Sequence, residues 1–130
     1  MIYMKSRIIP TLPETALSYN LDDERAEILS KVTEALGMEH KKIPLEKAGE
    51  SVGFLAGFTG FSSNGSNITD DGECVIFSGI EGKRLDVLLK SMRASGLVIP
   101  LKAVVTAHNQ SQSVKWLIEE LTKEHEMMQG

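Results

Sequence analysis

Apolar residues recur at helical spacing in three stretches of the chain, at positions 28–36, 85–92 and 114–121. A period of three to four residues is typical of helices that pack one face against a core. Gly37 follows the first stretch and Gly96 follows the second, and glycine adopts the positive φ that ends a helix at little cost. The pattern predicts three helices with these apolar faces: Ile28, Leu29, Val32, Ala35 and Leu36; Leu85, Leu88, Leu89 and Met92; Val114, Leu117, Ile118 and Leu121.

Strands are predicted between these helices at residues 16–19, 39–43, 74–77 and 103–106, and all of these runs except 39–43 are mainly apolar or β-branched. Pro44 closes the second run, because proline has no N–H to donate to a strand ladder. Asn109, with Gln112 three residues later, resembles a capping box and predicts the start of the last helix. The elements therefore alternate between strand and helix along the chain.

The chain resembles itself when it is shifted. Residues 51–55 (SVGFL) match residues 113–117 (SVKWL) at an offset of 62, which implies three extra residues in the second copy. We therefore expect one domain over residues 1–130, made of a first copy at about 14–58, a polar linking loop at about 59–73, and a second copy at about 74–126. At an offset of 59, five identities align: Arg25 with Arg84, Leu29 with Leu88, Lys31 with Lys90, Ala35 with Ala94, and Gly37 with Gly96.

This order of elements predicts an α/β fold, in which two βαβα pseudo-repeats share one mainly parallel sheet of about four strands. Each crossover between parallel strands is expected to be right-handed. A two-layer α+β sandwich of the ferredoxin-like kind is the alternative. The order of the strands within the sheet is left open by the sequence.

The composition is typical of a globular domain with a hydrophobic core, and it narrows the classes of partner that the protein can bind. The chain has 130 residues, 42% of them hydrophobic, and 14 basic against 18 acidic residues give a formal net charge of −4. Such a chain buries enough surface to fold without metal or disulfide. The charge disfavours sequence-independent binding to nucleic acid, which needs clustered basic residues. The few aromatic residues, one Trp, two Tyr and four Phe, supply little for stacking RNA bases.

Cysteine usage and hydropathy indicate a cytoplasmic protein. Cys74 is the single cysteine, so an intrachain disulfide is excluded and a reducing compartment is the simpler location. No 18 apolar residues run together, so we expect no membrane span. The first 13 residues lack the apolar run of a signal peptide.

The candidate binding residues follow the predicted strands. Ser78 and Gly79 precede a helix, where backbone N–H groups can hold an anion with help from Lys83, although the spacing does not match a P-loop. Ligands of open α/β sheets bind beyond the carboxyl ends of strands. We therefore expect a small anionic ligand at a shared edge formed by Asn20, Ser78, Gly79, Lys83, His108 and Asn109.

Residues 49–61 (GESVGFLAGFTGF) form the most unusual segment of the chain. If its middle is helical, Gly53 and Gly57 lie on one side and Phe54 and Phe58 on another. Such a surface lets two backbones approach closely. It therefore fits either packing against the sheet or self-association with a second copy.

Recognisable catalytic or metal-binding patterns do not emerge from the sequence. The histidines at 40, 108 and 125 lack metal-ligand spacing, and Cys74 has no CxxC partner. No Gly-x-Ser-x-Gly elbow is present. We therefore expect no metal and no cofactor, and we do not favour an enzyme.

The second half resembles a bacterial domain family through three features. These are the run 75–79 (VIFSG), the helix that ends at Gly96, and the run 100–106 (PLKAVVT) followed by Asn109. The family is the domain of unknown function 3783, and the resemblance covers about residues 74–121. It implies a small cytosolic protein and carries no activity, substrate or catalytic residue. The turn departs from the family at Ala107 and His108.

These observations support two functional hypotheses from different classes. The first is a non-enzymatic binding or interaction module, dimeric through the glycine and phenylalanine segment. The alternative is an enzyme or regulator that binds an anion or small metabolite at the carboxyl ends of the strands. An RNA-associated module is a third and weaker reading, because basic and aromatic residues do not cluster together.

Overall fold

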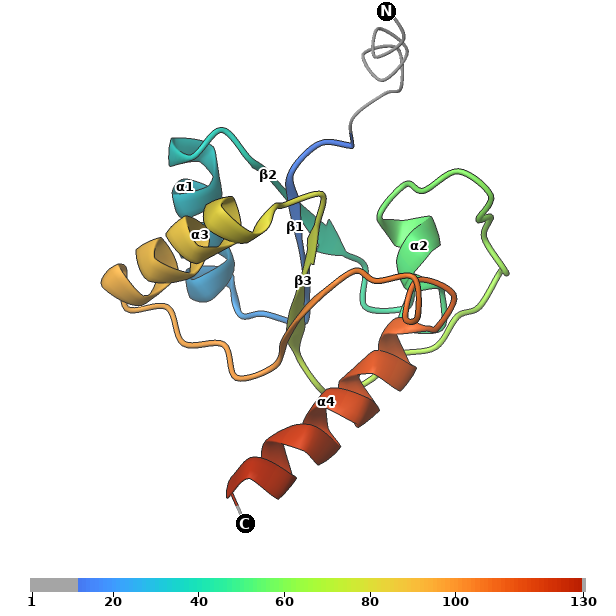
Figure 1. The fold of residues 1–130 in the computed structure, drawn as a ribbon. Helices are drawn as coiled ribbons and strands as arrows, with labels where there is room; N and C mark the ends of the chain where they lie inside the picture. Colours follow the sequence, from blue (N-terminus) through green and yellow to red (C-terminus); the bar gives the residue numbers. More distant parts are fainter. Residues whose placement is uncertain (1–11, 130) are drawn as a thin grey trace, which may run out of the picture.

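The structure is a computed structural model that describes residues 12–129. Eight elements follow one another along this part of the chain, in an order that alternates strands and helices (Figure 1). They are β1 (Thr15–Tyr19), α1 (Asp23–Ala35), β2 (Glu39–Ile43), α2 (Val52–Leu55), β3 (Cys74–Ser78), α3 (Gly82–Ala94), β4 (Lys102–Val104) and α4 (Val114–Gln129).

The four strands form one mixed sheet in the order β2-β1-β3-β4. The pairs β1–β2 and β3–β4 are parallel, as each intervening helix requires, but the central pair β1–β3 is antiparallel. In that central pair, Leu17 lies opposite Ile76 and Tyr19 lies opposite Cys74. The expected α/β class is confirmed, and the expectation of a mainly parallel sheet is corrected at the middle of the sheet.

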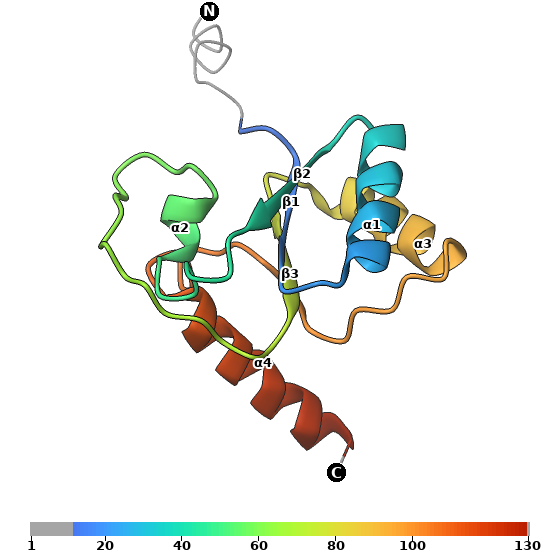
Figure 2. The same ribbon diagram turned by 180° about the vertical axis from the view of Figure 1, so that it is seen from behind.

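Helices cover both faces of the sheet, which excludes the two-layer alternative. Figures 1 and 2 show α1 and α3 on one face and α2 and α4 on the other. Side chains alternate along the strands, so Ala16 and Phe77 enter the core under α1 and α3, whereas Leu17 and Ile76 enter the core under α2 and α4. Both central strands are buried along their whole length, which explains their continuous apolar runs.

The ends of the long helices follow the sequence closely, with one correction. An oxygen of Asp22 accepts a hydrogen bond from the Arg25 N–H at 2.8 Å and caps α1, and Gly37 follows that helix with a φ of 74°. The last helix is capped by Ser113, whose hydroxyl accepts from the Trp116 N–H at 3.0 Å. The capping role expected of Asn109 is therefore wrong, because its side chain bonds within the preceding loop.

The segment at 49–61 forms only the short helix α2, so the expected glycine stripe does not exist. Gly57 takes a φ of 82° just beyond this helix. Gly53 donates its N–H to the Gln110 carbonyl at 2.7 Å, and a Cβ there would lie 2.9 Å from that oxygen and from the Phe61 ring. Gly53 is therefore a point of close packing within the chain, next to the half-buried Phe54 and Phe58.

Buried polar groups fasten the linking loop to the core. The carboxylate of Glu50, fully buried, accepts hydrogen bonds from the Ser63 hydroxyl and from the Asn64 N–H at 2.9 Å. The buried Tyr19 hydroxyl donates to the Leu45 carbonyl at 2.7 Å and accepts from the Asp70 N–H at 2.8 Å. The loop therefore has defined anchor points, since each of these buried groups would lose its partner if the loop detached.

Candidate functional site

The antiparallel central pair separates the candidate residues that the sequence placed together. Asn20 follows β1, where its side-chain N–H group donates to the Asp71 and Gly72 carbonyls, each at 3.1 Å. Ser78 ends β3 and lies opposite Thr15, at the start of β1. Asn20 and Ser78 thus lie at opposite ends of the sheet, so Asn20 is separated from the other candidates, whereas the parallel pairing of β3 and β4 leaves Ser78 and the loop after β4 at the same end.

The turn between β3 and α3 packs closely against the backbone carbonyl of Pro13. Gly79 has a φ of 73°, and a Cβ there would lie 2.8 Å from the Pro13 carbonyl oxygen. Lys83 is exposed in the first turn of α3. Its neighbour Arg84 is committed to Glu14, with donor–acceptor distances of 2.7 and 3.0 Å. Of the two basic side chains at this turn, Arg84 is therefore already paired within the chain.

The structure does bring His108 and Asn109 together, on the loop that follows β4. The buried Asn109 accepts from the Thr106 N–H at 2.9 Å and donates to the Val104 carbonyl at 3.0 Å, so it fixes the shape of the loop. The exposed ring of His108 meets the Trp116 ring edge to face, with centroids 6.0 Å apart. Both residues line a cavity beside β4.

Strand β4 lies at one end of the sheet, and in the described part of the chain β3 is its sole strand neighbour. The Leu101 carbonyl accepts from the Val75 N–H at 3.1 Å, and the Val105 N–H donates to the Phe77 carbonyl at 2.9 Å. Because backbone groups alternate in direction along a strand, those of Lys102 and Val104 point away from β3. The Val104 carbonyl already accepts from the Asn109 side chain, so the open edge consists of the N–H and carbonyl of Lys102 and the N–H of Val104.

Two cavities flank this open edge, and Lys102 lines both of them. One has a volume of about 500 Å³ and lies beside α3, and the other has about 470 Å³ and lies beside α4. The first is lined by Leu89, Met92, Arg93, Leu97, Val98, Ile99, Pro100, Lys102 and His125. The second is lined by Lys102, Ala103, Val104, His108, Asn109, Trp116, Leu117, Glu120, Leu121 and Glu124.

The two cavities differ in their chemistry. Buried apolar residues, among them Met92 and Leu97, form the wall beside α3. The wall beside α4 carries the Trp116 ring and the carboxylates of Glu120 and Glu124. Lys102 lies between the two walls, and its ammonium group donates to the Ile99 carbonyl. Burial, and then the charge of Arg93, lower the pKa of this group. The edge therefore joins an apolar wall to an acidic, aromatic one.

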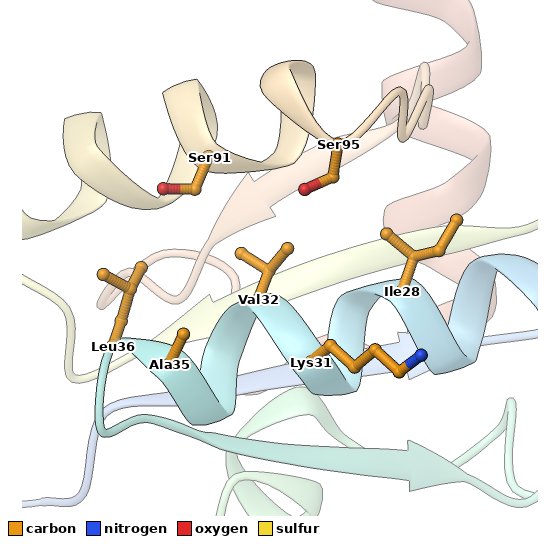
Figure 3. A pocket seen from close by; sticks show the side chains of 7 residues that line it. All are labelled: Ile28, Lys31, Val32, Ala35, Leu36, Ser91 and Ser95. Atoms are coloured by element: carbon orange, nitrogen blue, oxygen red, sulfur yellow. The ribbon is translucent and has the colours of Figure 1, made fainter.

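Two further hollows lie away from β4. A cleft of about 390 Å³ separates α1 from α3, and Figure 3 shows Ile28 and Val32 of α1, with Leu36 just beyond it, pointing toward Ser91 and Ser95. A second hollow of about 370 Å³ lies where β1 and β2 end. Within residues 12–129, no group of three metal-ligating side chains comes together, and no helix combines the length and apolar character needed to cross a membrane.

Sequence reasoning missed the edge of β4 because its binding features come from three separate elements. From the sequence, only Lys102 could be assigned to a face of its strand. That Trp116 and Met92 lie beside β4 depends on how α4 and α3 cross the sheet. The available signal was a short β-branched strand followed by the single tryptophan of the chain.

The fold and the edge of β4 define a small α/β domain with an accessible sheet edge. Residues 73–128 match the family model described as Domain of unknown function (DUF3783), which confirms the resemblance seen in the second half of the sequence. The residues that line both cavities beside β4 all fall within this match. No curated protein and no solved structure matches the chain.

Proposed function

We propose that the protein is an interaction module that holds an extended peptide segment of a partner along the open edge of β4. An extended peptide can add a strand to a sheet edge, where main-chain hydrogen bonds give affinity and pockets for alternate side chains give specificity. The observation that carries the proposal is the position of Lys102, whose backbone groups point outward and whose residue lines the cavities on both sides.

The chemistry of the two walls specifies the partner. Alternate side chains of an added strand point to opposite faces of the sheet. Those that face α3 meet Met92 and Leu97, so aliphatic residues fit there. Those that face α4 meet the Trp116 ring and Glu124, so lysine or arginine fits there through ionic and cation–π attraction. The net charge of −4 favours the approach of such a basic segment.

Trp116 is the one tryptophan of the chain, so its fluorescence reports on this site directly. The probe is a blocked peptide of about six residues that alternates valine with lysine, a length matched to a short strand. We expect a saturable change in Trp116 emission, and weaker binding of a peptide that alternates valine with glutamate. Equal binding of the two peptides, or no saturable change, would contradict the proposal.

Matched variants separate the contributions of charge and backbone. Glu124→Lys is expected to weaken binding about tenfold, the equivalent of losing ~1.4 kcal/mol of attraction. Glu119→Lys makes the same charge change on an exposed position of α4 that does not line the cavity, and it should have little effect. Val104→Pro removes an outward N–H and should weaken binding more than Val104→Ala, which keeps it.

A second copy of the chain is the competing occupant of this edge. Light scattering would then show a dimer for the wild type and a monomer for Val104→Pro. Addition of the basic peptide would not dissociate the wild-type dimer. That result would replace the peptide proposal with self-association through β4. It would also move the self-association expected from the sequence away from Gly53 and Phe58, since Gly53 is packed within the chain.

We also infer that the two halves descend from one duplicated βαβα unit. The helices α1 and α3 have 13 residues each, at the predicted offset of 59. Asn20 and Gly79, related by the same offset, both have positive φ. Ser51 and Ser113, related by the offset of 62, form an isolated bridge with each other. Such pairing of equivalent positions is expected where two copies pack about a local twofold axis.

A cytoplasmic location is part of the same proposal. Burial, followed by the charges of Asp70 and Glu73, raises the pKa of the Cys74 thiol to about 12. A buried thiol of this kind behaves as a small apolar group and not as a disulfide partner. A single cysteine, with no partner in the chain for a disulfide, fits a reducing compartment as the place where the protein works.

A further inference from the structure

A chain of three polar side chains lies between the sheet and α1, at the opposite edge of the sheet from β4. The hydroxyl oxygen of Ser18, in β1, is 2.7 Å from Nε2 of His40, in β2. The other ring nitrogen, Nδ1, is 2.6 Å from the hydroxyl oxygen of Ser30, in α1. The parallel register pairs Ala16 with His40, so Ser18 and His40 share the face that α1 covers.

The environment of His40 suits the role of a general base. Burial, and then the charge of Lys42, lower the pKa of the imidazole, so the ring is neutral at neutral pH. A neutral imidazole donates through one nitrogen and accepts through the other. When Nδ1–H donates to the Ser30 hydroxyl, the lone pair of Nε2 faces the Ser18 hydroxyl. In this tautomer Nε2 can take a proton from Ser18, and the bond to Ser30 keeps the plane of the ring in place.

Ser18 is only 3% exposed, but it borders a hollow at the end of its strand. It lines the hollow of about 370 Å³ where the parallel strands β1 and β2 end, the position at which α/β sheets bind ligands. Lys42 is the register partner of Ser18 and lines the same hollow. Lys42 therefore places a positively charged residue beside the hollow, where it favours an anionic or electron-rich substrate.

We propose that Ser18 is the nucleophile of an acyl-transfer site that hydrolyses a small ester, with His40 as its general base. The Ser18 oxygen attacks the carbonyl carbon while its proton passes to Nε2 of His40. The bond to the alcohol oxygen then breaks, and the alcohol leaves with that proton. In the second half, His40 takes a proton from water, and the hydroxide attacks the acyl group. The ester bond to Ser18 breaks, which returns the proton to Ser18 and releases the acid.

Labelling and turnover together test this site in the full chain. A fluorophosphonate probe is expected to modify the wild-type protein once, at Ser18, as located by peptide mass spectrometry. p-Nitrophenyl acetate should be hydrolysed faster than in buffer. Ser18→Ala should abolish both signals, and His40→Asn should reduce both by at least about 100-fold, the usual contribution of a general base. Ser91→Ala, a serine of the cleft between α1 and α3, is the control and should change neither.

The pH profile distinguishes catalysis from a merely structural hydrogen-bond chain. The rate should rise as His40 loses its proton, with a midpoint below the ordinary histidine value of 6.5. Circular dichroism of Ser18→Ala checks that the fold survives this small change. If the wild type is not labelled, or if Ser18→Ala is labelled as well as the wild type, the three side chains only fasten α1 to the sheet and the proposal fails. Either outcome leaves peptide binding at β4 unaffected.

Discussion

Arg25 and Glu73 form a two-pronged ion pair, in which each terminal nitrogen of the guanidinium lies 2.6 Å from one carboxylate oxygen. This pair joins the first turn of α1 to the residue before β3. Arg25 also donates to the Val98 carbonyl at 3.2 Å, on the way to β4. Glu73, followed by Asp22, raises the pKa of Arg25. One guanidinium therefore connects both parallel pairs of strands.

Breaking this pair should weaken the fold measurably. We expect Glu73→Gln to lower the free energy of unfolding by about 1 kcal/mol, the upper end for partly exposed pairs, because the negative charge and one of the two aligned hydrogen bonds are lost. Urea unfolding of Glu73→Gln, Arg25→Met and the double variant gives the coupling energy in a cycle. A coupling energy indistinguishable from zero would show that the ion pair orients the two side chains but adds nothing to the free energy of unfolding.

The buried carboxylate of Glu50 predicts an acid-sensitive linking loop. Hydrogen bonds from Ser63 and then from the Asn64 N–H lower its pKa below the ordinary 4.5. A carboxyl group whose pKa is lowered by folding adds stability above its unfolded value, and this stability is lost as the pH falls through the folded value. The midpoint of thermal unfolding should therefore be higher for the wild type than for Glu50→Gln at pH 7. That difference should shrink below pH 4.5; a constant difference contradicts the assignment.

Two glycines test how tightly α2 is held against the loop that precedes α4. A Cβ at Gly53 would lie 2.9 Å from the Gln110 carbonyl oxygen, so Gly53→Ala should cost about 1–3 kcal/mol by overpacking. Nothing lies within 4 Å of a Cβ at Gly82, which begins α3, so Gly82→Ala should be neutral or stabilising. Chemical unfolding of both variants makes the comparison, and equal effects would contradict the close packing at Gly53.

The cleft between α1 and α3 is a place where packing can be improved. In Figure 3, Val32 of α1 points toward Ser91 of α3 across the cleft. Ser91→Leu should fill part of the volume and raise the free energy of unfolding by about 0.5–1 kcal/mol more than Ser91→Ala does. The alanine variant removes the hydroxyl without filling the space, so it isolates the filling effect. No gain over alanine would mean that the cleft is shaped by the backbone and cannot accept a larger side chain.

The long helices could be predicted from the sequence because their signals are local. The apolar spacing of positions 28–36 and 85–92, followed by Gly37 and Gly96, placed the C-terminal ends of α1 and α3 within a residue or two of those observed. The α/β class followed from the alternation of elements. The antiparallel pairing of β1 with β3 could not be predicted, because relative strand direction depends on the path of the chain between them.

The candidate sites depended on the order and direction of the strands, which the sequence does not determine. Once β1 and β3 run in opposite directions, Asn20 and Ser78 cannot share an edge. Ser18 and His40 escaped notice because they are 22 residues apart and meet only through the parallel register of β1 and β2. Their signal was available in principle, since polar side chains on inward positions of a buried strand need partners.

The central claim, that the edge of β4 receives an extended basic and aliphatic peptide, is tested most directly by amide chemical shifts during titration. On addition of the valine–lysine peptide, the N–H signals of Lys102 and Val104 and the Trp116 indole should move most, and the two outward amides should exchange more slowly with solvent. Movements confined to β2, or to the cleft between α1 and α3, would contradict the claim.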